Sequence, residues 1–340
     1  MKVGIRIPPC RPVPEVAASA RLAEQAGFDA VTMPDSPTLW RDTFTALAFA
    51  ATATRLVELW SSVTNVVTRQ PVSLASSVRT VAELCGGRFH LGVGAADSSA
   101  FLSGRCPATT GELRSGIGLV TDLLRGAEAK VGDQAVTLQD PGGPVPVYLA
   151  AEGPRNTALA AAVADGVMTT FRDVDRKAER IAAAVAASGR TRPFHHVVVS
   201  FVKITDDPAR EAQELKPRIV KTIQSEGPRL FEEAGFDIRV PATPILLPDG
   251  TDIGHPRDLD EAVRVASQWV PDDAAVWYAG QIGLYGSPAE IAAGIDRLAG
   301  LGVAALHMTD GGSFDLPDAF VEQFGAEVLP RLRAGSGGGS

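Results

Sequence analysis

The sequence predicts an α/β protein, a (β/α)8 TIM barrel with an insertion after strand seven. The prediction rests on eight apolar segments that alternate with helical segments, and on a length of 340 residues, which suits one barrel with insertions. An open doubly wound sheet is the competing fold. The first apolar segment is followed by Pro8-Pro9-Cys10 rather than by a Gly-x-Gly-x-x-Gly turn, which together with the strand count favours the closed barrel.

The expected strands are short apolar segments bounded by turn residues. They cover residues 3–7, 30–33, 57–63, 88–93, 145–150, 167–170, 197–205 and 303–308. A β excursion is also expected at residues 131–138. This order of strands, with helices between them, implies a parallel sheet.

Helices are expected between the strands, and several carry recognisable end signals. Gly27 closes the first helix, Pro71 starts the third, and Ser287-Pro288-Ala289-Glu290 supplies an N-cap, an N1 proline and an early acid. The expected helices cover residues 14–26, 43–53, 71–84, 109–125, 156–164, 174–187, 208–224, 288–298 and 319–332.

Residues 225–285 interrupt this regularity, because they are rich in Pro, Gly and Asp and show only one helical piece, near 259–269. We expect them to form an insertion over the strand ends within one catalytic domain of residues 1–334. Residues 335–340, Gly-Ser-Gly-Gly-Gly-Ser, have the composition of an added linker. The first strand starts at once, so no signal peptide is expected before it.

Composition narrows the classes of partner and compartment. The net charge is −8 without a basic stripe, so nucleic acid is not an expected partner. No apolar run is long enough to span a bilayer. The three cysteines, Cys10, Cys85 and Cys106, form no C-x-x-C pair, which favours a reducing, cytoplasmic compartment.

The histidines do not predict a metal site. His90, His195 and His196 lie within or at the start of strands and lack the spacing to Asp, Glu or Cys that metal ligands show, so structural roles are expected. His307, near the end of the eighth strand, is isolated. No metal is therefore predicted.

The carboxyl ends of the strands carry the candidate site, because active sites of barrels lie at that face. Asp35 follows the second strand, where it could bind a ligand or donate a proton, and the competing interpretation is an N-cap before Trp40. Polar residues end the third strand. In the fourth strand, Gly94 and its neighbours allow a ligand to approach the backbone closely. These candidates are Ser62, Val63, Thr64, Asn65, Gly94, Asp97 and Ser98.

The fifth strand runs into a helix start that could bind an anion. Free backbone N–H groups and the helix dipole favour negative charge at such a position, and an ordinary helix cap is the alternative. A phosphate-bearing ligand is the preferred interpretation. The candidates are Ala151, Glu152, Gly153, Pro154 and Arg155.

Several motifs at these strand ends occur together. They are Ala23-Glu24-Gln25-Ala26-Gly27-Phe28-Asp29-Ala30-Val31 with Asp35, Val63-Thr64-Asn65 with Thr68-Arg69 and Pro71, Gly87-Arg88-Phe89 with Gly92, Gly94 and Asp97-Ser98, Ala150-Ala151 with Gly153-Pro154-Arg155, Ala164-Asp165-Gly166-Val167, and Gly286-Ser287-Pro288-Ala289-Glu290-Ile291. Jointly they resemble the luciferase-like superfamily of flavin and deazaflavin oxidoreductases. The resemblance is strongest to the coenzyme F420-dependent branch typified by methylenetetrahydromethanopterin reductase, and it is weakest across the insertion.

The resemblance implies a cofactor, F420 or alternatively FMN, at the mouth of the barrel, and commonly a homodimer. It implies a non-prolyl cis bond between Ser62 and Val63 behind the ring, and the cofactor phosphate near Gly153 to Arg155. Two departures concern the substrate and proton donor: members often have Asp-His where this chain has Asp35-Ser36, and often Asn-Pro where Val66 follows Asn65.

The leading functional prediction is an F420-dependent oxidoreductase that transfers a hydride to or from an electron-poor C=C, C=N or carbonyl group of a small-molecule or peptide substrate. Asp35 is the candidate proton relay, Trp40 would wall the substrate side, and residues 62–65 would hold the ring. The alternative is an FMN-dependent monooxygenase, which would consume oxygen. A Schiff-base lyase using Lys203 and a catalytically inactive ligand-binding barrel remain open.

Overall fold

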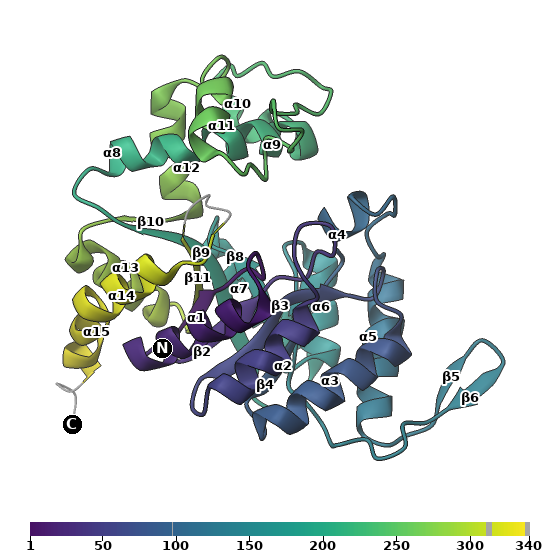
Figure 1. Ribbon diagram of the computed structural model, residues 1–340. Helices are drawn as coiled ribbons and strands as arrows, with labels where there is room; N and C mark the ends of the chain where they lie inside the picture. Colours follow the sequence, from purple (N-terminus) through teal and green to yellow (C-terminus); the bar gives the residue numbers. More distant parts are fainter. Residues whose placement is uncertain (97, 311–314, 337–340) are drawn as a thin grey trace.

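Eight parallel strands close into a barrel in the computed structural model of the chain, which describes residues 1–96, 98–310 and 315–336 (Figure 1). Around the ring they are β1 (Lys2–Arg6), β2 (Ala30–Met33), β3 (Glu58–Asn65), β4 (Phe89–Gly94), β7 (Val147–Ala150), β8 (Gly166–Thr170), β9 (His195–Ile204) and β11 (Val303–Thr309). Pairing of β11 with β1 and of β8 with β9 completes the ring. The predicted barrel is confirmed.

The helices of the repeat lie outside the barrel, as expected. They are α1 (Val13–Ala26), α2 (Thr43–Ala53), α3 (Pro71–Cys85), α5 (Thr110–Leu124), α6 (Pro154–Val163), α7 (Val174–Ser188), α13 (Pro288–Gly300), α14 (Asp318–Glu327) and α15 (Leu329–Ser336). Gly27 ends α1 with φ 97°, and Ser287 and Glu290 form a capping box on α13. The predicted closing helix is two helices, because Pro330 cannot donate the backbone hydrogen bond that would join them.

Two short excursions leave the repeat. A four-residue helix, α4 (Ser98–Phe101), follows β4. The hairpin of β5 (Ala129–Val131) and β6 (Gln134–Val136) corresponds to the expected β excursion and projects away from the barrel (Figure 1).

A helical cap, residues 208–282, interrupts the repeat after β9. It comprises α8 (Pro208–Glu211), a 3-10 turn η1 (Ala212–Leu215), α9 (Lys216–Glu226), α10 (Arg229–Glu233), α11 (Leu259–Ala266) and α12 (Asp272–Ile282). It lies beyond the carboxyl ends of β9 and β11 and has a separate hydrophobic cluster that includes Ile219, Phe231 and Tyr278 (Figure 1). The short strand β10 (Gly283–Gly286) leads back by pairing with the end of β9.

The sequence prediction for the cap differs from the structure in three respects. The insertion was expected to begin at residue 225, but the segment 208–224 already packs in the cap cluster. The expected single helix at 208–224 is three segments, since Pro217 interrupts the hydrogen-bond ladder at the start of α9. Helices α10 and α12 were not expected. In α12 buried alanines and Tyr278 leave no clear polar face, so helical periodicity is weak in the sequence.

Three further features of the described residues concern the cysteines, membrane-spanning helices and metal ligands. Cys10, Cys85 and Cys106 are all free thiols, and the first two are buried. Among the helices that the structure describes, none is long and apolar enough to cross a membrane. The described residues also contain no cluster of three or more His, Cys, Asp or Glu that could hold a metal ion.

Aromatic and imidazole rings fill the amino-terminal half of the barrel interior. Trp60 stacks on His90 with ring centroids 4.2 Å apart and meets His307 edge-on at 4.8 Å. Burial lowers the pKa of His90 to about 4, and burial together with the charge of His90 lowers the pKa of His307 to about 3. Both histidines are packing residues, which agrees with the prediction for His90; no structural role was predicted for His307.

We expect His307 to make the fold sensitive to acid. Its pKa is about 3 in the folded chain and about 6.5 in the unfolded chain. Between pH 6.5 and pH 3, the unfolded chain therefore binds a proton at this residue and the folded chain does not. Lowering the pH from 7 to 5 should therefore remove about 2 kcal/mol of unfolding free energy through this residue. Urea titrations at both pH values should show that loss reduced in His307→Gln. It should persist in His255→Gln, a cap variant, and an equal loss in both variants would contradict the assignment.

Candidate active site

The carboxyl ends of β2, β3 and β4 bring the first group of predicted site residues together. Asp35 and Ser36 follow β2, Thr64 and Asn65 end β3, and Ser98 begins α4 just after β4. The first four of these side chains are buried. Because the three strands are neighbours in the ring, residues far apart in sequence share one polar surface at the mouth.

Asp35 is the centre of this surface. Its carboxylate accepts a hydrogen bond of 2.6 Å from the Thr64 hydroxyl and a two-pronged pair from Arg69, with Nε at 2.5 Å and Nη2 at 2.9 Å. Arg69 also donates to Asp42 at 2.8 Å. Burial lowers the pKa of Arg69, but the two carboxylates outweigh burial and raise it overall. The guanidinium is therefore permanently charged and fixes both acids.

These contacts favour a positioning role for Asp35. Both carboxylate oxygens act as acceptors toward Arg69, and one also accepts from Thr64. To donate a proton, Asp35 would have to carry a hydrogen on one carboxylate oxygen. Arg69 and Thr64 already direct hydrogens at both oxygens, which leaves little room for another. The proton relay through Asp35 stays a prediction.

Asn65 organises the turn after β3. Its side-chain oxygen accepts hydrogen bonds from the backbone of Val67 at 3.0 Å and Thr68 at 2.8 Å, and its amide donates to Ser99 at 3.2 Å. Ser98 donates to Ser36 at 3.3 Å. The short helix α4 is thus tied to the ends of β2 and β3. Asp97, also predicted at the site, lies outside the described residues.

A bulge in β3 shapes the wall of the mouth. The pairing with β4 slips between Ser61 and Thr64, and the Ser62–Val63 peptide bond inside the slip is cis, as the family resemblance implies. The neighbouring glycines of β4 make room for it. A Cβ on Gly92 would lie 2.2 Å from the Ser61 carbonyl oxygen, and one on Gly94 would lie 2.8 Å from the Val63 side chain.

The end of β7 carries the predicted anion site. Gly153 is the N-cap of α6, followed by Pro154 and an exposed Arg155, and no described side chain caps this helix. Glu152 forms an ion pair with Lys177 and accepts a hydrogen bond of 2.7 Å from the Thr170 backbone. Glu152 therefore joins β7 to β8. Because no described side chain caps α6, the backbone N–H groups at its start are available to a ligand.

Trp40 and Ala151 complete the predicted set. Trp40 is partly exposed in the turn after β2, with its backbone donating to Ser36 at 2.9 Å, and Ala151 is buried at the end of β7. Both lie at the carboxyl end of the barrel. Trp40 can therefore form part of a pocket wall.

Lys203, near the end of β9, is held by acids. Its amine lies 3.2 Å from Glu214, 3.5 Å from Glu211 and 4.0 Å from Asp310. Burial lowers the pKa of this lysine, but the three carboxylates raise it overall. A Schiff-base lysine needs a neutral amine, so this environment argues against a lyase.

Three charged residues of the mouth were not among the predicted site residues: Arg69, Arg6 and Arg218. Arg6 ends the apolar strand β1, and a charge at the carboxyl end of a barrel strand is a signal that the sequence does contain. Arg218 lies on α9 of the cap. Its position needs the three-dimensional structure.

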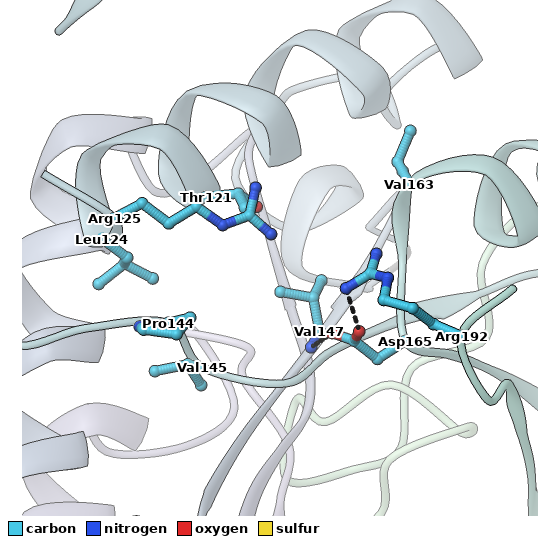
Figure 2. Close-up of a pocket in the computed structure, with 9 residues that line it drawn as sticks. All are labelled: Thr121, Leu124, Arg125, Pro144, Val145, Val147, Val163, Asp165 and Arg192. Carbon is cyan, nitrogen blue, oxygen red and sulfur yellow. Dashed lines mark hydrogen bonds and ion pairs between the residues drawn. The ribbon is translucent and has the colours of Figure 1, made fainter. Parts of the chain in front are cut away.

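A shallow pocket lies at the opposite end of the barrel, between the amino-terminal end of β7 and the ends of α5 and α6 (Figure 2). An ion pair between Asp165 and Arg192, 3.5 Å long, crosses it. The pocket has room for about one water molecule. It is remote from the polar strand ends, and we assign it no catalytic role.

Curated relatives match most of the chain. A 5,10-methylenetetrahydromethanopterin reductase of Methanolobus tindarius is 31% identical over 250 residues, covering 70% of this chain and 76% of that protein. An F420-dependent glucose-6-phosphate dehydrogenase of Beutenbergia cavernae is 28% identical over 346 residues, covering 94% of each chain. The second match includes the cap region.

Solved structures and a family model agree with the fold. The coenzyme F420-dependent tetrahydromethanopterin reductase of Methanopyrus kandleri has a TM-score of 0.75 at 19% identity, covering 97% of this chain and 99% of that one. An F420-dependent secondary alcohol dehydrogenase has a TM-score of 0.71 at 16% identity, covering 98% and 99%. The model of the luciferase-like monooxygenases matches residues 1–305, so the chain belongs to the luciferase-like monooxygenase family.

Proposed function

We propose that this chain is a coenzyme F420-dependent oxidoreductase that transfers a hydride between the deazaflavin and an electron-poor C=C, C=N or carbonyl group. The observation that carries the proposal is the match of relatives named for F420 or methanopterin chemistry over most of the chain. The mouth of the barrel supports it with an open helix start and a polar surface on the neighbouring strands.

The start of α6 fits the phosphate of such a cofactor. A Cβ on Gly153 would meet no described atom within 4 Å, so a ligand can approach the backbone there. Helix starts attract anions through unpaired N–H groups and the helix dipole. Arg155, which is exposed in the first turn, can add a charged hydrogen bond.

The β3 bulge with Thr64 and Asn65 would hold the cofactor ring, which when bound supplies a carbon that accepts or donates a hydride. Asp35 and Arg69 would keep the bulge and the β2 end in a fixed relation through their paired hydrogen bonds. Trp40 would wall the substrate side, and the cap would limit access of water. The substrate is a small molecule or a peptide.

Anaerobic titration with F420 and with FMN tests this function. We expect F420 to bind about tenfold or more tightly than FMN, and reduced F420 to be oxidised by some member of a panel of enones, imines and ketones. Tighter binding of FMN with oxygen consumption by the reduced complex would establish a flavin monooxygenase instead. Solved relatives of that type share only the fold with this chain.

Arg155→Ala should weaken F420 binding by about 1–3 kcal/mol, because it removes a charged donor while the backbone N–H groups remain. Fluorescence titration of F420 measures the change. Arg125→Ala, beside the remote pocket in Figure 2, is the control and should bind F420 as the wild type does. If Arg155→Ala also binds normally, the phosphate lies elsewhere.

Two expectations accompany the function. We expect residues 1–334 to act as one catalytic domain that forms a homodimer in the cytoplasm. Light scattering of the purified protein measures the oligomeric state, and a monomeric mass would contradict the dimer.

A further inference from the structure

Arg6 points into the barrel at its open end. It is the last residue of β1, two residues after Gly4. Gly4 faces the interior, because a Cβ added there would lie 2.9 Å from the ring of His307. Side chains alternate along a strand, so Arg6 faces the same way as Gly4, one layer nearer the mouth.

Phe201 lies at the same level of the barrel. Ile5 pairs with Met308 of β11, and Thr309 of β11 pairs with Phe201 of β9. Arg6 therefore lies in one row with Thr309 and Phe201. Two strand spacings separate the backbones of Arg6 and Phe201, about 10 Å.

The cap adds a second arginine to this row. The guanidinium carbon of Arg218 on α9 lies 4.7 Å from the centre of the Phe201 ring. Arg218 is exposed and Arg6 is half-buried. Burial, and secondarily the charge of Arg218, lower the pKa of Arg6 to about 10.

Neither arginine is paired with an acid of the described chain. Arg69 has Asp35 and Asp42, and Lys203 has Glu211, Glu214 and Asp310. By contrast, no carboxylate in residues 1–96, 98–310 and 315–336 forms an ion pair with Arg6 or Arg218. Guanidinium groups that form no direct ion pair keep N–H donors free for a bound anion.

Arg6 is distant from the proposed phosphate site. In the closed ring β1 and β7 are separated by β2, β3 and β4 on one side and by β8, β9 and β11 on the other. Arg6 and the start of α6 thus lie on opposite sides of the mouth. An anion at Arg6 is therefore separate from the cofactor phosphate.

We propose that Arg6 and Arg218 bind an oxyanion group, carboxylate or phosphate, of the substrate, with Phe201 beside it. This inference rests on the proposed function. The substrate class is then an organic acid or phosphate ester that also carries the reducible C=C, C=N or carbonyl group. Guanidinium groups suit this task because they donate to two oxygens at once.

Calorimetric titration with succinate and with inorganic phosphate, on apo and F420-loaded protein, tests the site. We expect wild-type protein to bind at least one of these anions. Arg6→Gln and Arg218→Gln should each weaken that binding about tenfold or more while F420 affinity stays within about twofold. Arg218→Lys should bind better than Arg218→Gln. Arg229→Gln, on the surface of the same cap, should match the wild type.

The outcomes separate this inference from the proposed function. Equal anion affinity in wild type, Arg6→Gln and Arg218→Gln would overturn the subsite, as would no binding of either anion to wild type. A loss of F420 affinity in both variants would assign the arginines to the cofactor instead. Failure of wild type to bind F420 would overturn the proposed function, whereas anion binding to apo protein is measured separately. If Arg6→Gln does not fold, the anion affinity of Arg218→Gln still tests the subsite, because Arg218 is exposed and its replacement should leave the fold intact.

Discussion

Gly92→Ala is expected to destabilise the barrel by about 3 kcal/mol and to abolish F420 binding. The added methyl carbon would lie 2.2 Å from the Ser61 carbonyl oxygen and 3.1 Å from the Met168 sulfur. Backbone cannot rotate away as a flexible side chain does, so β3 and β4 must separate. That separation falls on the bulge at Ser62 and Val63, where we expect the cofactor ring.

Gly118→Ala is the matched control. Gly118 lies in α5, and no described atom would come within 4 Å of its new methyl group. Alanine is the better helix former, so this variant should be more stable by about 0.5–1 kcal/mol. Urea unfolding and F420 titration of both variants give the comparison. A Gly92→Ala protein with wild-type stability and affinity would show that the bulge tolerates a wider spacing.

Asp35→Asn is expected to cost about 3 kcal/mol of stability and to weaken F420 binding about tenfold or more. The Asp35 side chain is 2% exposed, and its partner Arg69 is 20% exposed. Asparagine keeps the shape but not the charge, which leaves the guanidinium poorly compensated in a partly buried site. The hydrogen bond from Thr64 would weaken with it.

Asp42→Asn removes the other negative charge that pairs with Arg69, at a more exposed position. The Asp42 side chain is 48% exposed, so solvent compensates for its loss. Its role as N-cap of α2, accepting from the Thr45 backbone, suits asparagine equally well. We therefore expect a loss below about 1 kcal/mol. Equal losses of unfolding free energy in Asp35→Asn and Asp42→Asn would indicate that the burial of Asp35 adds nothing to the stability of its ion pair.

Local signals were sufficient to predict the elements of the barrel. Each strand is an apolar segment between turn residues, and helix ends carry their own marks, such as Gly27 after α1 and the Ser287 capping box before α13. These patterns act over a few residues and are therefore readable in sequence. The cap was harder to predict, because α12 is apolar on several sides and α10 is only five residues long.

The sequence by itself determined which residues stand at the strand ends, because a strand and the turn after it are adjacent in the chain. It thereby placed Asp35, Thr64 and Gly153 at one face of the barrel. Only the tertiary structure decided their partners. Arg69 binds Asp35 across 34 residues, and Arg218 packs on the Phe201 ring of β9 from a cap that follows seven of the barrel strands. Such pairings depend on how the ring closes and how the cap packs, which local patterns do not encode.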